Sequence, residues 1–202
     1  MIKIVDLCKK FDEKVLFDKY NLEIKDGEFV VLSGNSGAGK TTLLNMIGGL
    51  EPVDKGQIWV NDIEVTKRKN KLKYYRDIVG FLFQNFALVD KKTVRQNLKL
   101  VKKKSQNGLS IEEALEKVGL IDKLDTKVYK LSGGEQQRVA LARLMVKNSS
   151  VILADEPTGS LDVKNSEMVM NILKEINKSG KTVILVTHVE EYKNIGDRCI
   201  CL

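Results

Sequence analysis

The chain has 202 residues, 43% of them hydrophobic and 30% charged, a composition that is typical of a globular protein with a sizeable core and excludes a disordered or collagen-like chain. Its 34 Lys and Arg against 27 Asp and Glu give a net charge of +7, which permits contact with nucleic acid or an anionic membrane but demonstrates neither. Three cysteines and a single histidine exclude a secreted disulfide scaffold and offer too few ligands for a zinc site, so we expect the cysteines to be small apolar residues in a reducing cytosol.

Short apolar runs bounded by turn residues predict strands in the first third of the chain. We expect them at residues 2–5, 22–24, 29–33 and 57–60, with turns at residues 26–27 and 54–56. Residues 41–50 predict a helix that stops at the glycine pair 48–49, and residues 78–83 predict another strand. No run resembles a signal peptide or reaches the ~18 apolar residues of a membrane span, so another chain is expected to do any spanning.

The second half of the chain changes character. Residues 85–148 predict mainly helix, with capping boxes at residues 110–113 and 132–135 that begin helices running to about residue 118 and residue 147. Residues 151–154 and 183–187 are continuous apolar runs of the kind found in parallel strands, and a helix that ends near residue 180 lies between them. We therefore predict one α/β domain, residues 1–202, whose core (1–84 and 149–202) is interrupted by a helical subdomain at about 85–148.

Residues 34–41, Gly-Asn-Ser-Gly-Ala-Gly-Lys-Thr, match the phosphate-binding pattern G-x-x-x-x-G-K-[ST] between a predicted strand and a predicted helix. Glycines allow the backbone N–H groups to turn around phosphate oxygens, and the start of the helix adds unpaired donors. Lys40 can reach terminal phosphates, and the Thr41 hydroxyl is a Mg²⁺ ligand. The predicted nucleotide-binding residues are Asn35, Ser36, Gly37, Ala38, Gly39, Lys40, Thr41 and Thr42.

Two acidic residues, Asp155 and Glu156, follow the apolar run at residues 151–154. The carboxyl end of a parallel strand is where ligands bind in β/α sheets. Successive strand residues point to opposite sides, so the two acids are expected to have different roles. We predict that Asp155 holds Mg²⁺ and that Glu156 polarises the water that attacks the γ-phosphate.

Further motifs make the chain resemble the ATP-binding-cassette (ABC) ATPases. Residues 131–137, Leu-Ser-Gly-Gly-Glu-Gln-Gln, look like the signature of that family and precede the Asp155-Glu156 strand in the family's order. Gln84, residues 160–162 (Ser-Leu-Asp) and residues 187–188 (Thr-His) resemble its glutamine loop, aspartate loop and histidine switch. The resemblance covers essentially the whole chain. It implies a P-loop NTPase fold with a β/α core, an antiparallel β subdomain and a helical subdomain.

The resemblance also implies roles for single residues. Phe11 stands where the family more often has a tyrosine that stacks on adenine. Gln84 corresponds to a residue that contacts Mg²⁺ and water and senses the membrane partner, and His188 to the sensor of the γ-phosphate. The signature and aspartate loop would bind nucleotide across a head-to-tail homodimer that encloses two ATP molecules; the residues concerned are Ser132, Gly133, Gly134, Gln136 and Asp162.

Within the family, residues 48–52 and 155–162 look most like the group of macrolide exporters, lipoprotein-releasing complexes and bacteriocin transporters. That group implies an ATPase that binds ATP/ADP and Mg²⁺ in the cytoplasm and works at the inner face of the cell membrane with a separate permease. Export of a peptide, bacteriocin, antimicrobial or lipoprotein is the expected task. A cell-division ATPase without transport stays open as an alternative. A DNA-repair ATPase is disfavoured, because repair members of the family carry zinc modules or long coiled coils and this chain has neither the ligands nor the heptads. The basic runs 67–73 and 102–104 lack interleaved stacking aromatics apart from Tyr74 and Tyr75, so we interpret them as solvated faces and expect no nucleic-acid partner.

Overall fold

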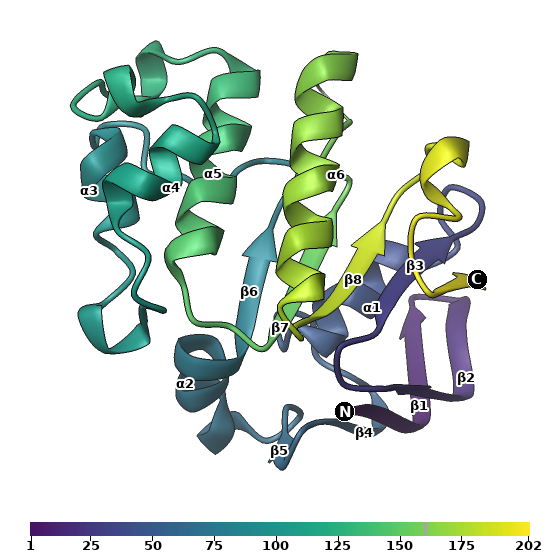
Figure 1. The fold of residues 1–202 in the computed structure, drawn as a ribbon. Coiled ribbons are helices and arrows are strands. Elements are labelled where there is room, and N and C mark those ends of the chain that lie inside the picture. Colours follow the sequence, from purple (N-terminus) through teal and green to yellow (C-terminus); the bar gives the residue numbers. More distant parts are fainter. Residues whose placement is uncertain (160) are drawn as a thin grey trace.

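The structure is a computed structural model that describes residues 1–159 and 161–202. Within those residues the strands form two sheets (Figure 1). The antiparallel sheet has the order β2 (Lys14–Ile24), β1 (Ile2–Phe11), β4 (Lys55–Val60), β5 (Ile63–Glu64). The parallel sheet has the order β6 (Val79–Leu82), β7 (Val151–Asp155), β8 (Thr182–Val186), β3 (Phe29–Ser33), β9 (Arg198–Cys201).

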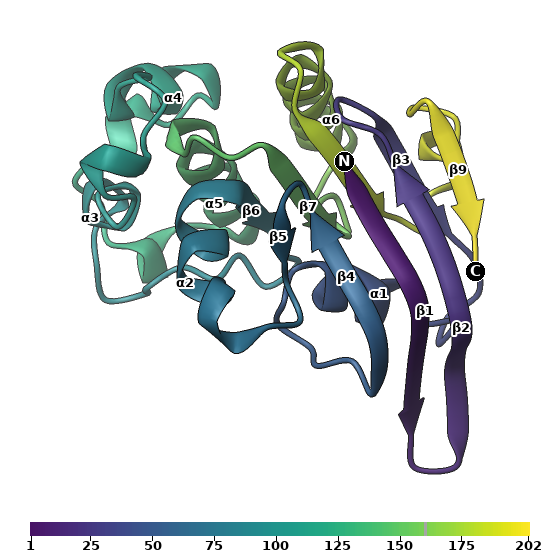
Figure 2. The same ribbon diagram turned by 90° about the horizontal axis from the view of Figure 1, so that it is seen from below.

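The helices are divided between the two faces of the parallel sheet. They are α1 (Lys40–Ile47), α2 (Lys71–Lys73), α3 (Val94–Leu98), α4 (Ile111–Lys117), α5 (Gly133–Val146) and α6 (Val163–Lys178). Helix α1 packs between the two sheets, where its buried Leu43 and Ile47 join one apolar cluster with residues of β1, β3 and β4. Helices α3 to α6 belong to a second cluster on the other face, where α5 and α6 stand beside each other (Figures 1 and 2).

This arrangement exposes one edge to ligands. The strands β3, β7 and β8 are parallel neighbours, so their carboxyl ends meet at the same edge of the sheet. The phosphate-loop pattern, the acidic pair and the histidine each follow one of these three strands. No helix of the described residues is long and apolar enough to cross a membrane.

The first two strands are much longer than the sequence predicted. The predicted residues 2–5 are the first part of β1, and residues 22–24 are the last part of β2. Both strands extend beyond them to a tight turn at residues 12–13 (Figure 2). Register shifts interrupt the pairing of β1 and β2, and Asp6 and Lys19 have positive φ angles of 47° and 48°. These irregularities disrupt the alternation of apolar and polar residues, which is the pattern that reveals a strand in sequence.

The other predicted elements differ less. The helix predicted at residues 41–50 ends at Ile47, because Gly48 caps it and Gly49 has a φ angle of 69°. The helical segment 85–148 contains α3, α4 and α5, and the latter two begin at the predicted capping boxes of Ser110 and Ser132. The segment at 68–78 was missed; it combines a 3-10 turn, the short α2 and a π-helical turn.

Candidate nucleotide-binding site

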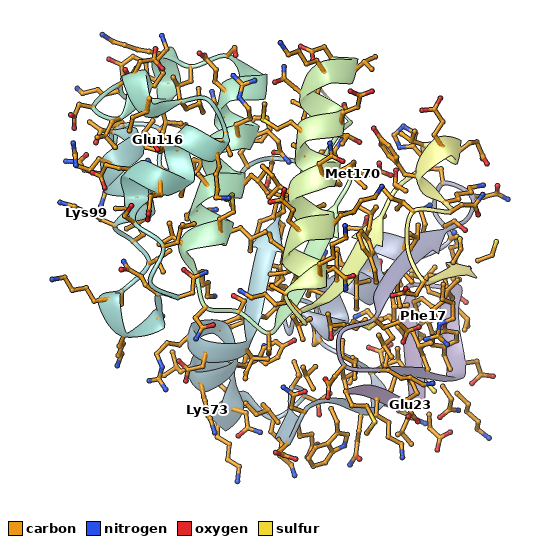
Figure 3. The ribbon with its side chains drawn as sticks, in the orientation of Figure 1. Phe17, Glu23, Lys73, Lys99, Glu116 and Met170 are labelled. Carbon is orange, nitrogen blue, oxygen red and sulfur yellow. The ribbon has the colours of Figure 1, made fainter. Side chains whose placement is uncertain are left out.

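The phosphate-loop pattern forms a tight loop between β3 and α1. Gly37 and Gly39 have φ angles of 76° and 97°, which side chains rarely tolerate. A Cβ atom on Gly39 would lie 3.0 Å from Cζ of Phe17, a buried residue of β2 that is labelled in Figure 3. The Lys40 ammonium donates hydrogen bonds to the carbonyls of Gly34 (2.8 Å) and Asn35 (2.9 Å). The loop therefore offers backbone N–H donors, a helix N-terminus and a cation within a few ångströms.

A residue of α1 and a residue of β7 meet beside this loop. The Thr41 hydroxyl donates a 3.0 Å hydrogen bond to Oδ1 of Asp155, which ends β7. Burial is the main cause that raises the pKa of the Asp155 carboxyl, and the charge of Glu156 adds to it, while the Thr41 hydrogen bond and the Lys40 charge act in the opposite direction. A divalent cation would offset this burial penalty, and hydroxyl and carboxylate oxygens are ligands that Mg²⁺ prefers, so the residues present fit this ion.

Gln84 lies in a cleft next to the carboxylate. The cleft has a volume of about 410 Å³, and Asp155, Phe83, Gln84 and Asn45 are among its lining residues. Gln84 comes two residues after the end of β6, the strand that pairs with β7. The structure therefore brings together Thr41, Asp155 and Gln84, the three residues predicted from sequence to hold Mg²⁺.

Glu156 and His188 face each other across the ends of β7 and β8. Nδ1 of His188 lies 2.8 Å from Oε2 of Glu156, and the histidine side chain is 69% exposed whereas that of the glutamate is 15% exposed. This Oε2 atom is buried and has no conventional hydrogen bond among the described residues. Glu156 also has a φ angle of 45°, a costly conformation for a non-glycine residue that is often found at functional sites. The contact joins the acidic residue that follows β7 to the histidine that comes after β8.

Phe11 stands at the tip of the β1–β2 hairpin and is 46% exposed. The ammonium group of Lys9 lies 4.7 Å from the centre of its ring. Lys9 is itself buried, donates to the carbonyl of Pro52 (2.9 Å) and pairs with Glu51 (2.5 Å). One face of the Phe11 ring is thus covered by a fixed cation, and a base can stack only on the other face. Lys9 was not predicted, because it lies on an irregular part of β1.

The signature residues form a separate helix tip. Ser132 caps α5 and accepts a hydrogen bond from the backbone of Glu135, in a complete capping box. Ser132 and Gly133 are exposed, and a Cβ on Gly134 would lie 3.5 Å from Leu161. The Gln136 amide donates to the carbonyl of Leu131 (3.1 Å). The tip therefore presents exposed backbone N–H groups that could bind an anion.

The aspartate-loop residues lie next to this tip. Asp162 caps α6 by accepting hydrogen bonds from the backbone N–H and the side-chain amide of Asn165. These bonds lower the pKa of the Asp162 carboxyl. Ser160, the first residue of the motif, lies outside the described residues.

A second hollow, which the sequence did not reveal, lies where β6 meets the helical segment. It has a volume of about 580 Å³ and an apolar floor to which Phe81, Phe83 and Leu144 contribute. The described lining residues include five cations and no carboxylate; the cations are Arg76, Lys102, Lys104, Arg143 and Lys147. Burial lowers the pKa of Lys147 to about 8. The basic run 102–104 therefore meets Arg76 and two basic residues of the α5 region at one groove that is both apolar and positively charged, whereas the basic residues of the run 67–73 do not line it.

The tyrosines between the basic runs are engaged inside the protein. Tyr74 is buried and donates to the carbonyl of Ile47 (2.8 Å), while Tyr75 donates to the carbonyl of Gly49 (2.6 Å). The ring of Tyr74 is fully buried and offers no stacking surface for bases, whereas Tyr75 lines the groove. Lys73, in the same segment, extends outward from α2 (Figure 3).

Comparisons with known proteins identify relatives along the whole chain. The pattern of a family described as ABC transporter matches residues 17–159. The chain is 40% identical over 93% of its length to the macrolide export ATP-binding/permease protein MacB of Campylobacter jejuni, of which it spans only 30%. It is 40% identical to the uncharacterized ABC transporter ATP-binding protein YvrO of Bacillus subtilis, covering 99% of this chain and 92% of YvrO.

Solved structures give the same result. A structure described as the dimeric post-hydrolysis state of the ATP-binding cassette MJ0796 bound to ADP and Pi superimposes with a TM-score of 0.87 and 37% identity. That comparison covers 100% of this chain and 94% of the other. MJ0796 comes from Methanocaldococcus jannaschii.

Proposed function

The chain belongs to the ABC transporter family and is an ATP-binding, ATP-hydrolysing cassette with the fold that its sequence predicted; from this premise we propose which residues do the work and what the ATPase drives. The observation that carries the proposal is the convergence of Lys40, Thr41, Asp155, Glu156 and His188 at one edge of the parallel sheet.

In the proposed site, the N–H groups of residues 35–42 and the Lys40 ammonium bind the phosphates of ATP. Thr41, Asp155 and Gln84 hold Mg²⁺, which when bound supplies positive charge beside the phosphate oxygens. Glu156 orients the attacking water through its carboxylate and accepts its proton. His188, held against Glu156, positions that carboxylate and contacts the γ-phosphate. Phe11 stacks on the adenine with its one free face.

The signature tip supports a head-to-tail homodimer as the active form. One chain carries two helix N-termini suited to anions, at Lys40 and at Ser132. In a C₂ dimer each phosphate loop would face the partner's tip, with Gly133, Gly134, Gln136 and Asp162 near the nucleotide. The similar cassette MJ0796 is described as dimeric with bound ADP and Pi.

A gel-filtration experiment tests the nucleotide-dependent dimer. Glu156→Gln, which keeps the shape of the side chain but removes its basicity, is applied with ATP and Mg²⁺ and compared with the same protein without nucleotide. We expect the elution volume to shift from that of a monomer to that of a dimer. Identical elution in both conditions would refute the dimer proposal.

We further propose that the ATPase powers a separate permease in the export of a peptide, bacteriocin, antimicrobial or lipoprotein, from a peripheral position on the cytoplasmic face of the membrane. Two points support this: the similarity to a protein that is named as a combined ATP-binding/permease macrolide exporter, and the apolar, positively charged groove that a partner could fill.

The permease proposal is tested by co-purification with the membrane protein encoded in the neighbouring reading frame. Arg76→Glu, at the rim of the groove, is expected to reduce the yield of the complex, and Lys174→Glu on α6 serves as the charge-matched control. Equal recovery of the membrane protein with the parent chain, Arg76→Glu and Lys174→Glu would exclude the groove as the docking site.

A further inference from the structure

The tip of the β1–β2 hairpin carries a lysine that the proposed reaction does not use. Lys14 is the first residue of β2 and pairs with Phe11 across the hairpin. Its Nζ atom donates a 3.1 Å hydrogen bond to the carbonyl oxygen of Gly37, in the middle of the phosphate loop. One side chain therefore links the hairpin that carries the aromatic ring to the loop that carries Lys40.

The link binds the loop through a carbonyl that the loop itself does not use. The N–H of the same peptide group, that of Ala38, donates to the carbonyl of Asn35 within the loop (3.2 Å), and the Gly37 carbonyl points the opposite way. Lys14 binds this Gly37 carbonyl, and Lys40 binds those of Gly34 and Asn35. Two ammonium groups from different elements thus hold the same short loop.

The charge of Lys14 is not neutralised locally. Among the described residues, no carboxylate lies within 4.0 Å of its ammonium group. The Nζ atom of Lys14 lies 3.1 Å from the Gly37 carbonyl oxygen, which is far shorter than the Debye length of about 8 Å at physiological salt. A polyphosphate in the loop would therefore experience the field of Lys14 in addition to that of Lys40.

We propose that Lys14 is a positioning residue for nucleoside di- and triphosphates: it fixes the Phe11 platform relative to the phosphate loop and adds a second positive charge to the phosphate site. The inference rests on the proposed role of the loop in binding ATP. Because ATP and ADP share the groups that lie between Phe11 and the loop, Lys14 is expected to strengthen the binding of both nucleotides. The effect of Lys14 on nucleotide affinity is expected to be the same whether or not the nucleotide carries a γ-phosphate.

Titrations of the full chain with ATP and with ADP, at low and at high salt, test this role. Lys14→Met is expected to raise the Kd of both nucleotides about fivefold at ~0.1 M salt, with a smaller effect at high salt. Lys14→Arg is expected to stay within about twofold of the parent, because the longer side chain keeps the charge. Lys10→Met removes a charge from the same hairpin and is the matched control, with an unchanged Kd.

A double-mutant cycle separates positioning from charge alone. If Lys14 holds Phe11 in place, the losses in Phe11→Ala and Lys14→Met are not additive, because the positioning of the ring has no further effect once the ring is absent. Binding by the parent protein in the same titrations verifies the ATP site itself. Unchanged Kd values in Lys14→Met, an equal loss in Lys10→Met, or fully additive losses in the cycle would each overturn the proposal.

Discussion

Gly39→Ala provides a quantitative test of the phosphate-loop geometry. Two costs are expected: Gly39 has a φ angle of 97°, and a Cβ atom would lie 3.0 Å from Cζ and 3.1 Å from Cε2 of Phe17. The backbone cost of a left-handed alanine is about 1–2 kcal/mol. Overpacking against a core ring adds about 1–3 kcal/mol. Phe17 is buried within the cluster that surrounds α1, so its ring has little room to move away.

Gly180→Ala is the matched control, because Gly180 has a φ angle of 88° but a Cβ atom added there would meet no atom within 4 Å. It isolates the backbone cost. Urea unfolding of both variants should show Gly39→Ala to be the less stable by the overpacking cost, and Phe17→Leu in the same chain should restore part of the loss. ATP titration should show weaker binding in Gly39→Ala alone. Equal stability of the two alanine variants, or no recovery with Phe17→Leu, would refute the packing argument.

Four further changes have defined outcomes. Lys40→Ala should weaken ATP binding in a nucleotide titration, because the loop loses its cation. Ser132→Ala should lower the rate of ATP hydrolysis more than it weakens nucleotide affinity, because this residue would act on the partner's nucleotide. Tyr74→Phe should lower the free energy of unfolding by about 1–2 kcal/mol in urea, since a buried carbonyl loses its donor. Lys147 has its pKa lowered from 10.5 to about 8 in the folded state, so between these values the unfolded chain binds more protons and stability should rise with pH. Lys147→Met should reduce that rise, and an unchanged pH profile would contradict the assignment.

The sequence predicted the parts of the site that depend on local patterns. The 34–41 loop, the acidic end of β7 and the capping boxes of α4 and α5 are each defined by neighbouring residues, and the structure has elements at those places. The strand at 29–33 was predicted with its observed bounds. The resemblance to ABC ATPases is confirmed by the family match and by the solved structures.

Features that depend on distant contacts could not be predicted in this way. Lys9 and Lys14 acquire their roles from Phe11 and Gly37, and β-bulges hide the strand pattern around them. The groove unites Arg76 with Lys102 and Lys104 and with Arg143 and Lys147, which are far apart in the sequence and come together only in the folded chain. Single-sequence patterns carry no information on such pairings.

The hydroxyls of Tyr74 and Tyr75 connect their segment to the C-terminal end of α1. They bind the carbonyls of Ile47 and Gly49, at the opposite end of the helix from the loop that would hold the phosphates. Eight helical residues make a rod of about 12 Å, clamped between two sheets. A displacement of the tyrosine segment would therefore have this rod as one direct route to the loop that carries Lys40.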